Sequence, residues 1–181
     1  MFGEQGNEPG QFNNPTGVCY DQKNQRILVS DRNNNRIQIF DKQGRFLKLF
    51  GSEGSNNGQF QYPEQICLQP NTNNILVADK SNHRVQQFNE NGDFKAVIGK
   101  GLLNEPTSVA CSLTTENMVV VDFCGVNEGK AHLFNPEHCK LIRSFGSKGN
   151  EQNQFDCVQG VCFDDERKRI LIVDGDCGRT N

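Results

Sequence analysis

The chain has 181 residues, of which 34% are hydrophobic and 23% charged, and its formal net charge is −3. This length suits one domain, and the composition excludes a coiled coil, which would be rich in Ala, Glu, Lys and Leu. The negative balance argues against a dedicated nucleic-acid module, and no apolar run approaches the roughly 20 residues that span a bilayer. The first residues lack the basic and apolar regions of a signal peptide. Together with the absence of an Asn-x-Ser/Thr sequon, this leads us to expect a cytoplasmic protein.

The first part of the chain contains short β-rich runs separated by turn residues. These runs are Gly17–Asp21, Arg26–Asp31, Arg36–Asp41 and Phe46–Gly51. The second run is continuously apolar at its centre, which is typical of a strand covered on both faces. The third run alternates between polar and apolar residues, and this predicts a half-exposed strand.

The same pattern recurs along the whole chain, with copies at about 12–51, 60–99, 103–146 and a partial one at 155–181. Each copy has an aspartate sixteen residues after its proline position, and a basic residue follows the aspartate. The aspartates and their basic partners are Asp31 and Arg36, Asp79 and Arg84, Asp122 and Lys130, and Asp174 and Arg179. The third copy has three extra residues before its lysine. Such periodicity indicates a repeat architecture.

Four strands in each unit, with no helical period, are typical of a β-propeller blade. One blade cannot bury both of its faces, whereas stacked blades can. The sequence therefore predicts an all-β propeller segment with about three complete four-stranded blades and partial blades at both ends.

Two stretches resemble NHL repeats: PTGVCYD…ILVSDRNNNRIQIFDKQGRFLKLFG and ILVADKSNHRVQQFNENGDFKAVIG. WD40 repeats are disfavoured because the chain has no Trp, and kelch repeats because it has no Gly-Gly doublet. The resemblance is strongest to the C-terminal NHL domain of tripartite-motif proteins. Because NHL propellers of this kind form six-bladed rings, the resemblance implies that the chain is a fragment of such a ring.

The resemblance also implies a function, namely a protein-interaction module that recognises substrates for a RING-type E3 ubiquitin ligase. Zinc would then be bound only by RING and B-box domains upstream, and we expect no cofactor in this segment. RNA binding with post-transcriptional regulation is an alternative within the same family. A secreted six-bladed enzyme similar to the peptide-amidating lyases is a further alternative. We expect a protein partner, with RNA as the alternative, and neither a membrane nor a small-molecule substrate.

In a propeller, the turns between second and third strands share one face with the links between blades. We expect this face to contact the partner through Arg32, Asn34, Lys80, Asn82, His83 and Lys148. The repeated aspartate and basic pairs are interpreted as structural, because equivalent positions in every copy favour a shared packing role. We identify no catalytic residue and no metal ligand, and the mixed-charge run Asp164–Arg169 is interpreted as a solvated turn.

The eight cysteines show no CxxC spacing, which disfavours a zinc finger. Cys19, Cys67 and Cys162 occupy equivalent apolar strand positions. This favours reduced thiols packed in the core, although disulfides and a metal site remain alternatives.

Overall fold

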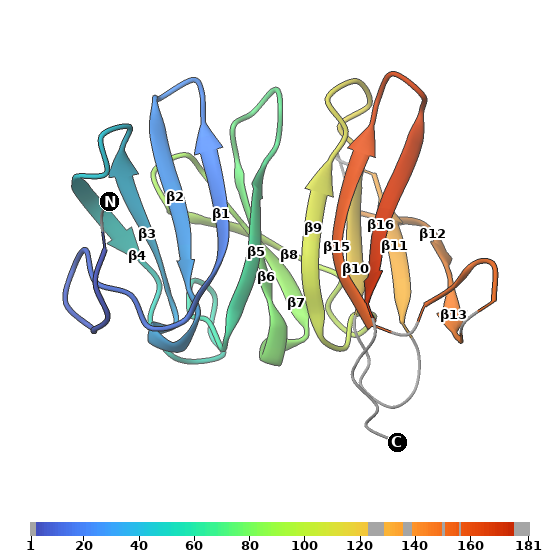
Figure 1. Cartoon of the computed structure of the whole chain (residues 1–181), viewed down its shortest axis with the longest axis horizontal. Helices are drawn as coiled ribbons and strands as arrows, with labels where there is room; N and C mark the ends of the chain where they lie inside the picture. Colours follow the sequence, from blue (N-terminus) through green and yellow to red (C-terminus); the bar gives the residue numbers. More distant parts are fainter. Residues whose placement is uncertain (1–2, 123–128, 136–138, 150, 156, 176–181) are drawn as a thin grey trace.

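The computed structural model describes residues 3–122, 129–135, 139–149, 151–155 and 157–175. Its β-sheets stand next to one another along an arc, with their strands roughly upright in Figure 1. Among the described residues, three sheets have four strands each and two have two strands each. The three four-stranded sheets and the last two-stranded sheet are called blades 1 to 4 in chain order. Among the described residues, no helix is long and apolar enough to cross a membrane.

The strands follow the chain order within each blade and pair antiparallel. Blade 1 consists of β1 (Pro15–Asp21), β2 (Arg26–Asp31), β3 (Arg36–Asp41) and β4 (Phe46–Phe50). Blade 2 consists of β5 (Pro63–Leu68), β6 (Ile75–Asp79), β7 (Arg84–Phe88) and β8 (Phe94–Ile98). Blade 3 consists of β9 (Pro106–Cys111), β10 (Met118–Asp122), β11 (Lys130–Phe134) and β12 (Leu141–Phe145). Blade 4 is the hairpin of β15 (Cys157–Asp164) and β16 (Arg169–Gly175).

The first strand of every blade is innermost, because β1 contacts β5, β5 contacts β9, and β9 contacts β15. A short parallel pair, β13 (Ser147–Lys148) and β14 (Gln154–Phe155), precedes blade 4. Parallel bridges Gln5–Phe12 and Glu53–Phe60 occupy the corresponding places before blades 1 and 2. This architecture confirms the predicted propeller with three complete blades.

The hydrophobic core is divided into three clusters, one at each junction between consecutive blades. Between blades 1 and 2, the fully buried Phe60 ring lies 6.3 Å from the Phe50 ring and 5.5 Å from the Phe88 ring. Phe50 ends the first copy of the repeat, Phe60 begins the second copy, and Phe88 lies within that second copy. The repeated aromatic positions are therefore the side chains that join neighbouring blades.

The prediction of a half-exposed third strand was wrong, because β3 is buried at every position from Arg36 to Phe40. The loop that enters blade 1 covers its polar side chains. Gln38 donates Nε2–H to the carbonyl of Gln11 at 2.6 Å and accepts the N–H of Gly10 at 2.8 Å. The exposed outer strand is instead β4, where Leu47 is 53% exposed.

The second strands β6 and β10 are buried at every position, as their continuous apolar runs indicate. Strand β16 differs, with Leu171 and Val173 exposed by 43% and 59%. Cys162 on β15 is also exposed, although its repeat position led us to place it in the core. These side chains lie on the side of blade 4 that no described segment covers.

Candidate partner-binding face

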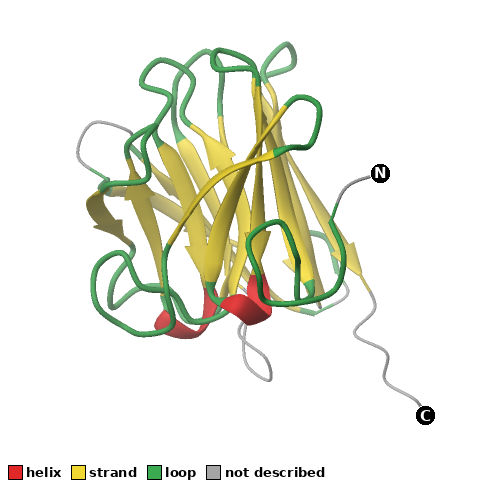
Figure 2. Ribbon diagram, turned by 90° about the vertical axis from the view of Figure 1, so that its left-hand side faces the viewer, coloured by secondary structure: helices red, strands yellow, loops and turns green. Residues whose placement is uncertain are grey.

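Two short 3₁₀ helices mark one end of the blades, η1 (Arg32–Asn34) and η2 (Lys80–Asn82). Figure 2 shows both at the lower end of the molecule, together with loops that join blades. Each helix ends in a left-handed residue, Asn35 with φ 52° or His83 with φ 57°. The N–H of that residue closes the turn by donating to the carbonyl of Arg32 or Lys80.

The aspartate before each 3₁₀ helix organises the turn from inside the blade. Asp79 is fully buried, and its Oδ1 accepts the N–H of Gln61 at 2.8 Å while its Oδ2 accepts Nε–H of Arg84 at 2.8 Å. Asn82 donates to the same carboxylate at 2.9 Å. Burial raises the pKa of Asp79, although these hydrogen bonds act in the opposite direction.

Blade 1 repeats this arrangement with the same geometry. Asp31 accepts Nε–H of Arg36 at 2.8 Å and the N–H of Asn13 at 2.7 Å. In both blades the arginine also donates to backbone carbonyls of the loop entering the blade, which for Arg36 are those of Asn7, Glu8 and Gln11. Each Asp and Arg pair thus attaches an inter-blade loop to the blade that follows it.

In blade 3, Asp122 accepts the N–H groups of Asn104 at 2.8 Å and Glu105 at 2.6 Å. Lys130 lies opposite Asp122 in the ladder of β10 and β11, where blades 1 and 2 have arginine. His132 occupies the place of Gln38, and its Nε2 lies 3.7 Å from Oδ2 of Asp122. This distance is too long for a hydrogen bond.

In blade 4, Asp174 lies on β16 opposite Val158. Arg179 lies outside the described residues. The pairing expected for this copy therefore stays a prediction.

Two of the residues expected to contact a partner are used within the chain. Asn34 donates Nδ2–H to Oδ2 of Asp31 at 2.8 Å and to the carbonyl of Gly6 at 3.0 Å. Asn82 donates in the same way to Asp79 and to the carbonyl of Gly54. Their side chains hold the 3₁₀ turns against the inter-blade loops.

Two basic residues of this face, Arg32 and Lys80, are paired with glutamates of the following blade. Nε of Arg32 lies 2.9 Å from Oε1 of Glu64, and Nζ of Lys80 lies 3.6 Å from Oε2 of Glu105. Arg32 also stacks over the ring of Tyr62, with 4.6 Å between the guanidinium carbon and the ring centroid. Such a stack is a cation–π contact.

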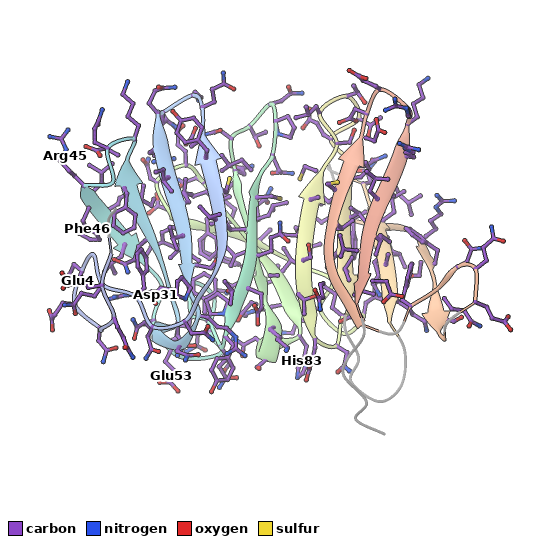
Figure 3. All side chains as sticks on the ribbon, in the orientation of Figure 1. Glu4, Asp31, Arg45, Phe46, Glu53 and His83 are labelled. Carbon is purple, nitrogen blue, oxygen red and sulfur yellow. The ribbon has the colours of Figure 1, made fainter. Side chains whose placement is uncertain are left out.

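The remaining two candidates of this face differ in what the structure describes. His83 is exposed, and its Nδ1 is hydrogen-bonded to the carbonyl of Asn104. Figure 3 shows His83 and Glu53 at the same lower end of the blades. Lys148 lies in β13, and its side chain lies outside the described part of the structure.

A cleft of about 580 Å³ opens on this face between blades 1 and 2. Its lining residues are Arg32, Asn33, Asn35, Glu53, Gln61 and Tyr62. Tyr62 is 44% exposed, and its backbone is fixed because its N–H donates to Oδ1 of Asn35 at 2.9 Å. The cleft therefore combines an exposed, rigidly held aromatic ring with amide groups and one carboxylate.

Sequence reasoning did not identify Tyr62 as part of this face. The available signal was its position directly before the repeat proline Pro63, where copy one has Asn14 and copy three has Glu105. An aromatic residue at a position that varies among copies is not needed by the repeat itself. Only the structure shows that the ring lies against Arg32 from the preceding blade.

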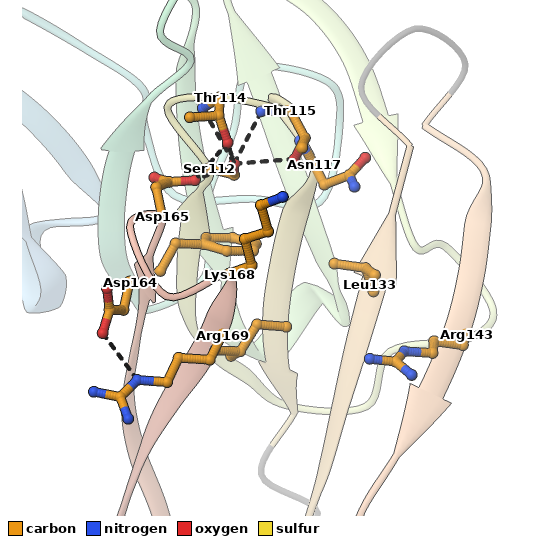
Figure 4. A pocket seen from close by; sticks show the side chains of 12 residues that line it. Ser112, Thr114, Thr115, Asn117, Leu133, Arg143, Asp164, Asp165, Lys168 and Arg169 are labelled. Carbon is orange, nitrogen blue, oxygen red and sulfur yellow. Dashed lines mark hydrogen bonds and ion pairs between the residues drawn. The ribbon is translucent and has the colours of Figure 1, made fainter.

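A second hollow, of about 320 Å³, lies between blades 3 and 4 near the opposite end (Figure 4). Here Asp165 accepts hydrogen bonds from the hydroxyl groups of Ser112 and Thr114 and from the N–H of Leu113. These contacts hold the pKa of Asp165 below its usual range. The run Asp164–Arg169 is therefore docked through Asp165 onto blade 3, whereas Arg167 remains exposed.

The described ranges bring no three His, Cys, Asp or Glu side chains together in an arrangement that could hold a metal ion. The face is also balanced in charge, because its described Arg32 and Lys80 each pair with a glutamate. The features of this face that could contact a partner are therefore its cleft, its amide groups and the Tyr62 ring, and its two described cations are already paired.

Comparison with known proteins agrees with this architecture. The family model described as "NHL repeat" matches residues 12–40 and 60–88, which hold the first three strands of blades 1 and 2. Among solved structures, the chain is similar to one from the nidogen/laminin complex, with a TM-score of 0.72, 16% identity, and coverage of 88% of this chain and 56% of that one. A gluconolactonase from Xanthomonas campestris gives a TM-score of 0.67 at 9% identity, with 88% and 54% coverage. At these identities, the likeness concerns the fold alone.

The curated relatives are similar to this chain along about one quarter of its length. Protein brain tumor of Drosophila melanogaster is 58% identical over 45 residues, and protein lin-41 of Caenorhabditis elegans is 50% identical over 46 residues. The E3 ubiquitin-protein ligase TRIM71 of Xenopus tropicalis is 47% identical over 45 residues. Each match covers 25% of this chain and only 4% to 5% of the relative. The chain thus carries NHL repeats similar to those of tripartite-motif NHL proteins, and it folds them into consecutive blades of a β-propeller.

Proposed function

We propose that this chain is a protein-interaction module that binds its partner on the face formed by the 3₁₀ turns and the inter-blade loops. The observation that carries the proposal is the cleft between blades 1 and 2, where Arg32 stacks on the exposed Tyr62. Tyr and Arg are enriched among the residues that dominate binding energy at protein interfaces. A tyrosine held by its own backbone hydrogen bond also loses little conformational freedom on binding.

The charge of the face supports a protein partner over RNA. Single-stranded RNA binding requires a positive groove along the backbone path as well as stacking platforms. Here the described Arg32 and Lys80 are neutralised by Glu64 and Glu105, and Glu53 adds a carboxylate to the cleft.

The test is proximity labelling in cells with the biotin ligase fused to the chain, comparing two double variants. Tyr62→Ala with Arg32→Ala removes the stack at the cleft. Tyr20→Ala with Arg167→Ala removes the same residue types elsewhere, since both are exposed. We expect the labelling of a defined set of proteins to fall at least about tenfold with the cleft variant and to stay unchanged with the control variant. Equal labelling of every protein by both variants would refute the proposal.

As a finer proposal, the chain is the substrate-recognition part of a larger cytoplasmic protein with RING-type ubiquitin ligase activity. The similarity to a relative named as an E3 ubiquitin-protein ligase supports this. The test is ubiquitin transfer by the full-length protein to a partner identified above. The cleft variant should lose transfer to that partner and retain self-modification, and unchanged transfer would contradict the role.

RNA binding is a second candidate, favoured by the same Arg32 and Tyr62 stack, because a base could lie on an exposed aromatic ring. Filter binding to a random single-stranded RNA pool at moderate and high salt tests it. Salt-sensitive binding that the cleft variant abolishes would support this candidate. Binding that is absent, or equal for both variants, would remove it.

A further inference from the structure

Two thiols meet at the junction of blades 2 and 3. Cys67 lies on the inner strand β5 and Cys111 on the inner strand β9, and their Sγ atoms are 3.8 Å apart. Both side chains are partly buried and pack against the same hydrophobic cluster, which contains Leu76, Val109 and Met118. The pair is therefore in direct contact within a well-packed region.

The pairing depends on which way each side chain faces. Cys67 faces blade 3 from β5, and Cys111 faces blade 2 from β9, so the two thiols meet across the junction. Cys19 holds in blade 1 the repeat position that Cys67 holds in blade 2, and it packs into the cluster between blades 1 and 2. There the repeat position of Cys111 is occupied by Leu68, which packs in the same cluster. Of these two junctions, the one between blades 2 and 3 therefore has a second thiol, that of Cys111, where the other has Leu68.

We propose that Cys67 and Cys111 are a redox modification site, at which hydrogen peroxide closes a reversible disulfide that joins the inner strands of blades 2 and 3. A disulfide requires the sulfur atoms to approach from 3.8 Å to about 2.05 Å. The innermost strands β5 and β9 are already in contact.

The chemistry balances with peroxide as the two-electron oxidant. One thiolate attacks a peroxide oxygen, the O–O bond breaks, and a sulfenic acid and hydroxide form; the hydroxide takes up a proton and leaves as water. The second thiolate then attacks the sulfenic sulfur, the S–S bond forms as the S–O bond breaks, and the displaced hydroxide takes up a proton and leaves as a second water. The sum is two thiols and one peroxide giving one disulfide and two waters, and a dithiol reductant reverses the step.

The surroundings set the rate of this reaction. The hydrogen bond shared with Cys111 and burial both raise the pKa of Cys67 well above its ordinary value. Because the thiolate is the nucleophile, the reaction is slow at neutral pH and faster in alkaline solution. Such slow oxidation suits a response to sustained rather than brief peroxide exposure.

The test oxidises the purified chain with hydrogen peroxide at about pH 7.5 and about pH 8.5, blocks free thiols with N-ethylmaleimide, and maps linked peptides without reduction. Cleavage after Glu116 separates Cys111 from Cys124, so the linked cysteines are assigned directly. We expect a linked peptide joining Cys67 to Cys111, lighter by two hydrogens, formed faster at the higher pH and removed by dithiothreitol. The oxidised chain should also melt several degrees higher, because the cross-link restricts the unfolded chain.

Cys111→Leu is the matched test variant, since blade 2 has Leu68 at that repeat position, and Cys19→Ser is the control. The linked peptide should disappear with the first and persist with the second. The wild-type peptide map decides the question even where a variant fails to fold. Recovery of Cys67 and Cys111 only as separately oxidised or separately blocked residues at both pH values would overturn the proposal, as would their linkage to other cysteines.

Discussion

Arg84 donates its Nε hydrogen to Oδ2 of the buried Asp79 at 2.8 Å, while its Nη2 donates to the carbonyls of Asn56 and Gln59 at 2.9 Å each. One side chain therefore joins the second strand, the third strand and the incoming loop of blade 2. The planar guanidinium group allows these bonds to form together, which a lysine ammonium could not reproduce with the same geometry.

Arg84→Ala should lower the free energy of unfolding by about 3 kcal/mol, because it leaves a buried carboxylate without its charged partner. Arg45→Ala is the control: Arg45 also pairs with an aspartate, at 2.6 Å, but its side chain is 77% exposed. An exposed pair contributes about 0.5 kcal/mol. Urea denaturation of both variants measures the difference, and equal losses would contradict a structural role for the buried pair.

His132→Gln should stabilise the chain by about 0.5 to 1 kcal/mol, the net value of one hydrogen bond. The Nε2 atom of His132 is buried without a hydrogen-bond partner among the residues that the structure describes, whereas Gln86 at the same place in blade 2 donates to Asp79 at 3.0 Å. The reciprocal change Gln86→His should destabilise the chain. Thermal unfolding of the two variants checks both signs, and a loss of stability on His132→Gln would show that its bond to Ser144 matters more.

Gly51→Ala should cost about 3 kcal/mol, and Gly58→Ala about 1 kcal/mol. Both glycines have positive φ, 91° and 83°, so both substitutions introduce backbone strain. At Gly51 the added Cβ would also overlap the ring of Phe60, whereas at Gly58 it meets nothing within 4 Å. Melting temperatures separate the two costs, and a comparable loss at both positions would mean that strain alone accounts for them.

The free energy of unfolding should fall as the pH drops below about 4, in part because of Asp21. Burial opposes ionisation of Asp21, but hydrogen bonds from Asn24, Asn73 and Arg26 outweigh it and lower its pKa below 3.8. A carboxylate with a lowered folded-state pKa adds stability above its unfolded pKa and loses it as the pH falls through the folded value.

Asp21→Asn should therefore be less stable than the wild type near neutral pH and lose less stability on acidification. Urea denaturation at several values between about pH 6 and pH 3 measures both slopes. Parallel curves for the two proteins would show that the titration of Asp21 does not contribute.

The turn of Asp21 also shows a contact that the repeat analysis missed. Asp21 accepts Nε–H of Arg26 at 2.7 Å and Nδ2–H of Asn73 from blade 2 at 3.0 Å. Arg26 in turn donates to the carbonyl of Glu90 at 2.7 Å. Blade 2 has Gln69 and Asn74 in the corresponding places, but blade 4 has Asp164 and Arg169 there. Nε of Arg169 lies 2.8 Å from Oδ2 of Asp164, so a comparison of the first copy with the fourth indicates this ion pair.

The blade can be predicted from residue order, because the spacing of proline, aspartate, arginine and phenylalanine reflects contacts that blades 1 and 2 share. Local turn chemistry and apolar runs are read along one chain segment, so the strands could be assigned from residue order. The burial of β3 could not be predicted in this way, because Arg36 and Gln38 are covered by a loop that lies more than twenty residues earlier in the chain.

The contacts between neighbouring blades could not be predicted from residue order. The stack of Arg32 on Tyr62 and the meeting of Cys67 with Cys111 both join residues of different copies. Tyr62 and Cys111 depart from the repeat, so periodicity carries no information about these two contacts. Their neighbours are set by how far each blade is rotated against the next, and packing across the whole junction fixes that rotation.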